Sequence, residues 1–110
     1  MNPLISIITV TRNAGSTLPA TLRSIREQTC GLYEFVLVDG GSTDSTVQLA
    51  LEAGIPNMKM VSEPDNGLYD AMNKGLGMAD GDYVMFLNAG DAFHSPDTLQ
   101  MIADAAMDHD

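Results

Sequence analysis

Blocks of apolar residues along the chain predict four β-strands. Two near-continuous apolar and β-branched runs, Leu4 to Thr11 and Glu34 to Asp39, are typical of strands buried on both faces. Two shorter runs, Met58 to Val61 and Tyr83 to Leu87, predict a third and a fourth strand. Since strands buried on both faces need helices above and below them, the pattern already favours a parallel sheet.

Residues at helical spacing follow each predicted strand. The spacing predicts helices from Thr17, from Ser42-Thr43-Asp44, over Leu68 to Ala79 with Met72 and Leu76 in the core, and from Ser95-Pro96-Asp97. Right-handed crossovers turn this βαβαβαβα order into an α/β fold, a Rossmann-like parallel sheet with helices on both faces. The predicted strand order is about 3-2-1-4, in one domain spanning residues 1–110.

Polar residues directly after the strands mark a candidate site, because open α/β sheets bind ligands at the carboxyl ends of their strands. Asp39 ends the second strand, and Gly40 after it permits close approach of a ligand. A carboxylate there can accept hydrogen bonds from a base edge or from ribose hydroxyls. Thr11, Arg12 and Asn13 end the first strand, with Arg12 a candidate phosphate or ribose contact. Turn and helix capping is the alternative role.

Two later segments are expected at the same edge of the sheet. Asp65, Asn66 and Gly67 form a turn, and Asp70, Asn73 and Lys74 continue it along one helix face, for which simple solvation is the alternative. Asn88 and Asp91, on a tight glycine turn after the fourth strand, can both face a hard cation such as Mg²⁺ or Mn²⁺. A plain β-turn is the alternative there.

The charge of the chain excludes one class of partner and raises a question about another. Fifteen acidic residues against five basic ones give a net charge of −10, which disfavours nucleic acid. A nucleotide diphosphate would then need a divalent cation and helix N-termini to supply positive charge. The single cysteine, Cys30, favours a reducing cytoplasm, and no apolar run is long enough for a secretory signal or a membrane span.

Four motifs in this order resemble the family 2 glycosyltransferases of the GT-A fold. They are Ile5 to Asn13, Val38 to Thr46, Asn66-Gly67, and Phe86 to Asp91. The segment from Ser62 to Gly75 is most similar to transferases of bacterial exopolysaccharide synthesis, such as those for colanic acid. The resemblance covers about residues 4–100.

The resemblance implies sugar transfer from a nucleotide-sugar donor, favouring a UDP-sugar, to a saccharide or lipid-linked acceptor. It implies inversion at the anomeric carbon and a divalent metal. Asp39 matches the family's base-contacting aspartate, and Thr11 and Asn13 match its first nucleotide-binding strand end. The family usually has aspartate at the positions of Asn88 and Gly90, so either Asp91 holds the metal or metal dependence is weak.

Family members use about twice this length for a complete GT-A domain, so we expect the chain to be the donor-binding half. No catalytic base is assigned, because nothing after Asp91 matches one, and whether the fragment alone is active stays open. An incomplete domain would expose apolar faces, which favours a homodimer. In the full-length protein, attachment to the inner face of the membrane stays open. The alternatives are a non-catalytic nucleotide-binding or interaction module and a nucleotidyltransferase, which would want a basic glycine-rich loop.

Overall fold

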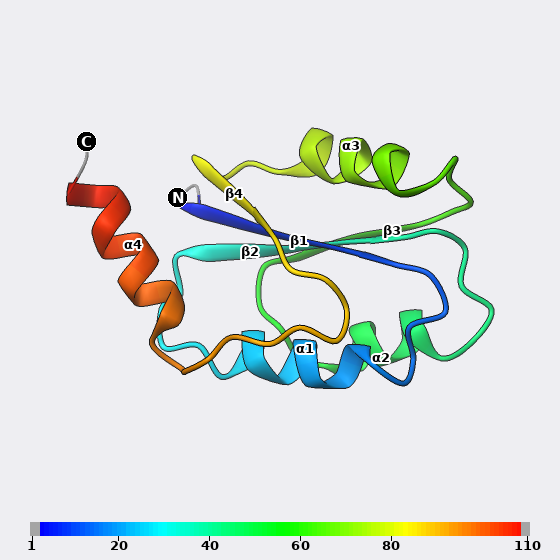
Figure 1. Ribbon diagram of the computed structural model, residues 1–110, viewed down its shortest axis with the longest axis horizontal. Coiled ribbons are helices and arrows are strands. Elements are labelled where there is room, and N and C mark those ends of the chain that lie inside the picture. Colours follow the sequence, from blue (N-terminus) through cyan, green and yellow to red (C-terminus); the bar gives the residue numbers. More distant parts are fainter. Residues whose placement is uncertain (1–2, 109–110) are drawn as a thin grey trace.

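The chain forms a three-layer α/β structure in which helices cover both faces of one sheet (Figure 1). The computed structural model describes residues 3–108. Within them, strands and helices alternate in the order β1 (Ile5–Thr11), α1 (Leu18–Arg26), β2 (Tyr33–Asp39), α2 (Thr46–Glu52), β3 (Met58–Ser62), α3 (Leu68–Met78), β4 (Tyr83–Phe86) and α4 (Thr98–Asp108). None of these helices is long and apolar enough to cross a membrane.

The sheet is parallel throughout and has the order β3-β2-β1-β4, which confirms the predicted order. The two central strands are buried along almost their whole length, as their apolar runs predict. β4 pairs with β1 only from Ile5 to Ile8, whereas β2 pairs with β1 as far as Thr11. The carboxyl edge of the sheet is therefore made mainly by β1, β2 and β3.

The two faces of the sheet have separate cores. On one face, α1 and α2 pack beneath the sheet, and Leu99 and Ala103 of α4 join the same cluster around Phe35 and Leu37 (Figure 1). On the other face, α3 alone covers Ile8, Val36 and Val38.

The face of α3 that meets the sheet differs from the prediction. Ala71 and Gly75 are its buried residues, whereas Leu76 is 47% exposed and Met72 is half-buried. A Cβ atom on Gly75 would lie 2.6 Å from Cγ2 of Ile8, so the helix backbone lies directly against the sheet. The prediction that Leu76 belongs to the core is wrong, because small residues allow a close approach that large ones would prevent.

The second helix also starts later than predicted. Ser42, Thr43 and Asp44 belong to the loop after β2, and α2 begins at Thr46 with Ser45 as its N-cap residue. Asp44 accepts a hydrogen bond from the Thr46 amide at 3.0 Å and another from the Thr46 hydroxyl. Side chains in this loop therefore hold the backbone out of a helix until Thr46.

Candidate functional site

Asp39 ends β2 with its carboxylate enclosed by hydrogen-bond donors. It is 0% exposed. Oδ1 accepts from the hydroxyls of Thr11 at 2.8 Å and Ser42 at 2.5 Å. Oδ2 accepts from the amides of Gly41 at 3.1 Å and Ser42 at 2.8 Å and from the hydroxyl of Ser62 at 2.8 Å. Asp39 therefore ties the ends of β1, β2 and β3 together beneath the surface, and its direct contact with a nucleoside stays a prediction.

These donors keep Asp39 ionised despite its burial. Burial alone would raise the pKa of the carboxyl group, but the hydrogen bonds from Ser42, Thr11 and Ser62 outweigh it and lower the pKa below its ordinary value. Ser62 lies 23 residues away in sequence and was not predicted to take part. Its only sequence signal is its position directly after the third apolar run.

The loop after β1 is bound to the loop after β2 by a second set of hydrogen bonds. The Asn13 amide donates to Oγ of Ser42 at 2.7 Å, and Oδ1 of Asn13 accepts from the Thr43 amide at 2.8 Å. Further along, the Gly15 amide donates to Oδ2 of Asp44 at 3.0 Å. The bonds of Asn13 with Ser42 and Thr43 are called the clasp below. Asp44 therefore connects this loop to the start of α2.

A hollow of about 290 Å³ opens beside the end of β1, on the face covered by α3. Its apolar wall comes from β1 and α3, and its polar residues include Thr11, Arg12 and Asp65; the lining residues are Val10, Thr11, Arg12, Asp65, Gly67, Leu68 and Ala71. Gly67 and Leu68 bring the N-terminus of α3 to it, which adds partial positive charge. The structure thus brings predicted site residues from two segments, Thr11 and Arg12 after β1 and Asp65 and Gly67 before α3, into one hollow.

Gly40, which follows Asp39, lies against the side chain of Asp65. A Cβ atom there would lie 2.7 Å from Oδ2 of Asp65, so the backbone and the carboxylate are in close approach. Oδ1 of Asp65 accepts from the Gly67 amide at 3.1 Å, which fixes the turn before α3. A side chain at position 40 would therefore displace the Asp65 carboxylate from this position.

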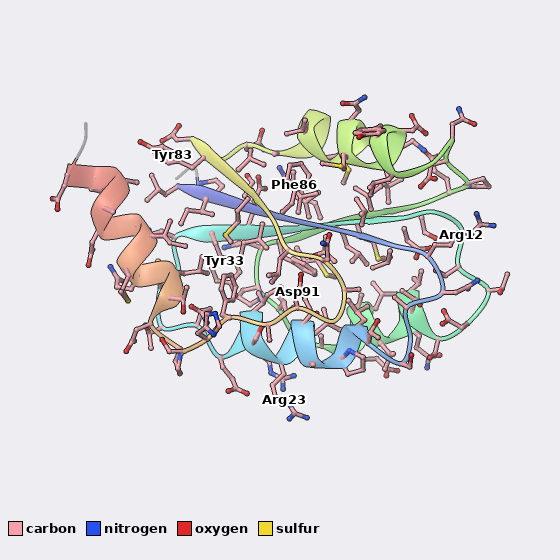
Figure 2. The ribbon with its side chains drawn as sticks, in the orientation of Figure 1. Arg12, Arg23, Tyr33, Tyr83, Phe86 and Asp91 are labelled. Atoms are coloured by element: carbon pink, nitrogen blue, oxygen red, sulfur yellow. The ribbon has the colours of Figure 1, made fainter. Side chains whose placement is uncertain are left out.

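Arg12 is the cation that this hollow offers. Its guanidinium makes no hydrogen bond or ion pair within residues 3–108, and the side chain lies at the carboxyl end of the sheet (Figure 2). Lys59 and Lys74 are held in ion pairs, and Arg26 donates to the Ala53 carbonyl. Arg23 has no partner among the described residues either, but it lies on α1, across the sheet from the hollow (Figure 2).

The predicted polar face of α3 exists but lies largely outside the hollow. The Asn66 amide donates to Oδ2 of Asp70 at 2.9 Å, which caps the helix start. Lys74 pairs with Glu63 at 3.1 Å and with Asp70 at 3.7 Å. Asn73 is exposed. Asn66, Asp70 and Asn73 do not line the hollow, so their contact with a nucleotide stays a prediction.

The turn at Asn88 to Asp91 is anchored on α1. Oγ1 of Thr21 donates to the Asp91 carbonyl at 2.7 Å and accepts from the Gly90 amide at 2.8 Å. Asn88 and Asp91 are exposed, and neither lines the hollow. Figure 2 shows Asp91 well back from the end of the sheet at which Arg12 lies. The structure therefore does not bring these two residues together with Arg12.

A metal would find few protein ligands at this turn. Nowhere in residues 3–108 do three or more His, Cys, Asp or Glu side chains gather in a way that could hold an ion. Asp91 supplies one carboxylate and Asn88 one amide oxygen. Such a set suits Mg²⁺ or Mn²⁺ only when substrate phosphate oxygens complete the coordination.

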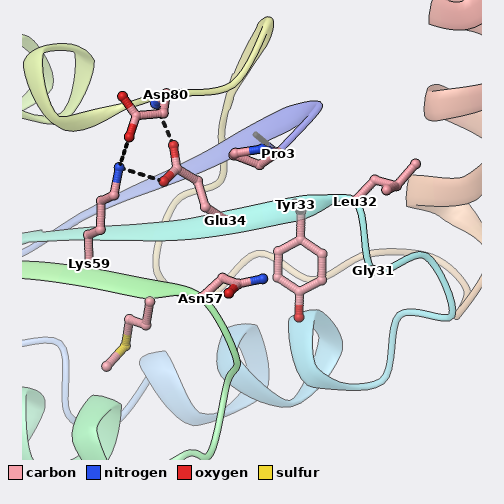
Figure 3. Close-up of a pocket in the computed structure, with 9 residues that line it drawn as sticks. Pro3, Gly31, Leu32, Tyr33, Glu34, Asn57, Lys59 and Asp80 are labelled. Atoms are coloured by element: carbon pink, nitrogen blue, oxygen red, sulfur yellow. Dashed lines mark hydrogen bonds and ion pairs between the residues drawn. The ribbon is translucent and has the colours of Figure 1, made fainter. Parts of the chain in front are cut away.

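A second hollow, of about 420 Å³, lies at the opposite end of the sheet (Figure 3). Beside it, the buried carboxylate of Glu34 accepts from Oγ of Ser6 and from the Asp80 amide, each at 2.6 Å, and pairs with Lys59 at 2.8 Å. These groups fasten the loop before β4 onto β1 and β2. Sequence reasoning missed this cluster, although an acidic residue inside an otherwise apolar strand is a signal for it.

Comparisons with known proteins agree on one family and one fold. The family model described as glycosyl transferase family 2 matches residues 6–110. A PGL/p-HBAD biosynthesis glycosyltransferase of Mycobacterium bovis is 44% identical over 98% of this chain and 43% of its own length. The uncharacterized glycosyltransferase YibD of Escherichia coli is 28% identical over 96% of this chain and 31% of its own. The chain thus spans less than half the length of these relatives.

Solved structures also match nearly the whole of this chain. Staphylococcus aureus TarS 1–349 in complex with UDP-GlcNAc superposes with a TM-score of 0.89 at 27% identity, over 96% of this chain and 32% of TarS. The mannosyltransferase PcManGT of Pyrobaculum calidifontis, in complex with GDP-Man and Mn²⁺, gives a TM-score of 0.78 at 30% identity, over 90% of this chain and 31% of its own.

Proposed function

The chain belongs to glycosyl transferase family 2, and on that premise we propose that it forms the donor-binding half of a glycosyltransferase. It would transfer a sugar from a nucleotide-sugar donor, with a UDP-sugar favoured, to a saccharide or lipid-linked acceptor in bacterial polysaccharide synthesis. The observation that carries the proposal is the hollow at the end of β1, in which the exposed Arg12, without a partner among residues 3–108, lies beside the N-terminus of α3. A crystal structure of TarS, whose fold this chain shares, is of its complex with UDP-GlcNAc.

We place the nucleotide in this hollow. Val10, Leu68 and Ala71 give an apolar wall for a base, while Arg12 and the helix N-terminus suit phosphate oxygens. Asp39 acts from beneath by holding the ends of three strands in place. The predicted direct contacts from Asn66, Asp70 and Asn73 remain part of the proposal at the rim.

Mg²⁺ or Mn²⁺ is proposed at Asp91 and Asn88. When bound with a donor, such an ion would supply positive charge to the leaving diphosphate. Because the turn that carries Asp91 is held against α1, away from the hollow, the donor would have to extend from the hollow toward that turn. Inversion at the anomeric carbon is proposed on the family's pattern, and the acceptor's base is not assigned to any residue of this chain.

Two further proposals concern the state of the protein. Exposed apolar side chains on β4 and α4 support the predicted homodimer; they are Tyr83, Val84, Phe86, Met101 and Met107. Light scattering across a concentration series would test it. The predicted cytoplasmic location, with contact to the inner membrane face in a longer protein, is likewise kept as a proposal.

Titration of the chain with UDP, by calorimetry or chemical shift, with and without Mn²⁺, tests the proposed function. Arg12→Ala should weaken binding about tenfold, as expected for a charge-assisted contact. Arg23→Ala removes the same charge from an arginine that also has no partner in the described part of the chain but lies across the sheet, and should leave the affinity unchanged. No shift or heat at millimolar UDP would refute the proposal, as would equal effects of the two variants.

A further inference from the structure

Arg12 lies between two anchored residues, although its own side chain has no partner in the described chain. On one side, the Thr11 carbonyl accepts from the Gly40 amide at 2.8 Å. On the other side, Asn13 makes the clasp with Ser42 and Thr43. The backbone of Arg12 is therefore fixed at both ends, while its guanidinium projects from the edge of the hollow.

Asn13 meets two demands at once. Its φ of 51° lies in the left-handed region, which asparagine adopts more readily than most residues other than glycine. Its side-chain oxygen accepts from the Thr43 amide at 2.8 Å and from the Thr43 hydroxyl at 3.4 Å. Glycine would satisfy the backbone but would lose the acceptor, and alanine would lose both.

The clasp also continues inward. Oγ of Ser42, which accepts from the Asn13 amide, donates to Oδ1 of the buried Asp39. Asn13 is thereby connected to the carboxylate that joins the ends of three strands. This chain of hydrogen bonds holds an exposed loop in a fixed position relative to the rigid sheet.

We propose that Asn13 is a positioning residue, which holds Arg12 at the hollow for a nucleoside diphosphate through the clasp instead of contacting the ligand itself. This inference rests on the proposed function. Its physical basis is preorganisation, since an arginine on a loop that is already ordered loses less conformational freedom when it binds a phosphate. The backbone amide and Oδ1 of Asn13 are both engaged in the clasp, so its ordering role requires no contact with the ligand.

The test is a thermodynamic cycle with UDP as the probe. Asn13→Ala and Asn13→Gly should each weaken UDP binding about fivefold, the size expected for losing a hydrogen bond that orders the site. In the Arg12→Ala background, either change at position 13 should have no further effect on the affinity. A role that is merely structural would weaken both backgrounds equally.

Asn57 provides the matched control. It has a φ of 55°, it precedes β3 at the opposite end of the sheet, and its side chain makes no hydrogen bond with the described residues. Asn57→Ala should lower the melting temperature through backbone strain but leave UDP affinity within twofold of the parent. Hydrogen exchange at the Thr43 amide should be faster in both Asn13 variants and unchanged in Asn57→Ala.

The outcomes separate the two proposals. If the parent chain does not bind UDP, the proposed function fails and the inference fails with it. If the parent binds and Arg12→Ala weakens binding, but the Asn13 variants bind as the parent does, only the positioning role is overturned. Additive effects of Arg12 and Asn13 substitutions would also overturn it, because Asn13 would then act independently of Arg12.

Discussion

Removing the Asp39 carboxylate should destabilise the fold at the edge that forms the site. In Asp39→Ala, the amides of Gly41 and Ser42 lose their acceptor, while the hydroxyls of Thr11 and Ser62 can rotate toward other groups. An unsatisfied buried donor costs about 1–3 kcal/mol. Since Gly41 and Ser42 are half-buried and water can reach them in part, we expect a loss of about 2–4 kcal/mol in the free energy of unfolding.

Asp39→Asn should cost less, about 1–2 kcal/mol, because charge-assisted hydrogen bonds become neutral ones. The remaining side-chain oxygen can still accept hydrogen bonds from the amides of Gly41 and Ser42. The new NH₂ group can donate to the hydroxyls of Thr11 and Ser42. The pH dependence provides an independent check. The pKa of Asp39 is lowered in the folded state, so its stabilisation is present above its ordinary value of 3.8 and is lost as the pH falls through the folded pKa.

Urea unfolding followed by circular dichroism at pH 7, 5 and 3 measures both quantities. The difference between the parent and Asp39→Asn should be full at pH 7 and pH 5 and smaller at pH 3. Asp82→Ala removes an equal charge from an exposed aspartate without a partner among residues 3–108, and should stay within about 0.5 kcal/mol of the parent. An Asp39→Ala loss below 1 kcal/mol, or a pH-independent difference, would refute the reasoning.

The other expectations concern α3, the opposite edge and the metal. Gly75→Ala should destabilise the fold by about 1–3 kcal/mol, because the added methyl group would overpack against the sheet. Gly77 lies in the same helix with open space around it, so Gly77→Ala should stabilise the fold by up to about 1 kcal/mol. Thermal unfolding of the two variants distinguishes these opposite effects. Glu34→Gln should lower the melting temperature by roughly 4–8 °C at pH 7. Although burial would raise the pKa of Glu34, hydrogen bonds from Asp80 and Lys59 lower it, so the loss should shrink below pH 4.5, and a loss that is constant with pH would contradict this. Asp91→Ala should reduce any gain in UDP affinity from Mn²⁺ by about tenfold, measured by titration with and without the ion, and an undiminished gain would place the metal elsewhere.

The strands and their order could be predicted because the signal is local. Each apolar run is long enough to identify a strand, and the alternation with helices leaves few ways to connect a parallel sheet. The packing of α3 could not be predicted in the same way. Met72 and Leu76 have the hydrophobic spacing, but Ala71 and Gly75 have the volume that fits against Ile8. Hydrophobicity alone does not report how closely two backbones can approach.

The site divides along similar lines. Asp39 and Arg12 could be assigned to the carboxyl edge because each follows a recognisable strand. The full set of hydrogen bonds to Asp39 could not be predicted, because it includes Ser62, which comes close to Asp39 only through the pairing of β2 with β3. Asp91 was expected to lie at the same edge of the sheet as Arg12 and Asp39, and whether it does depends on the length of β4. That strand ends opposite Ile8, while β1 runs on, so the next turn folds back onto α1.

Charge explains why the ordering of one loop matters in this protein. With a net charge of −10, the chain as a whole repels a diphosphate. Its lysines are paired with carboxylates, and Arg23 is on α1, so attraction at the carboxyl edge has to come from Arg12, the N-terminus of α3 and a bound cation. A single mobile arginine would offset little of the repulsion, because ordering its side chain would cost part of the contact energy. Fixing its backbone beforehand, through Thr11 and Asn13, makes one positive charge effective against many negative ones.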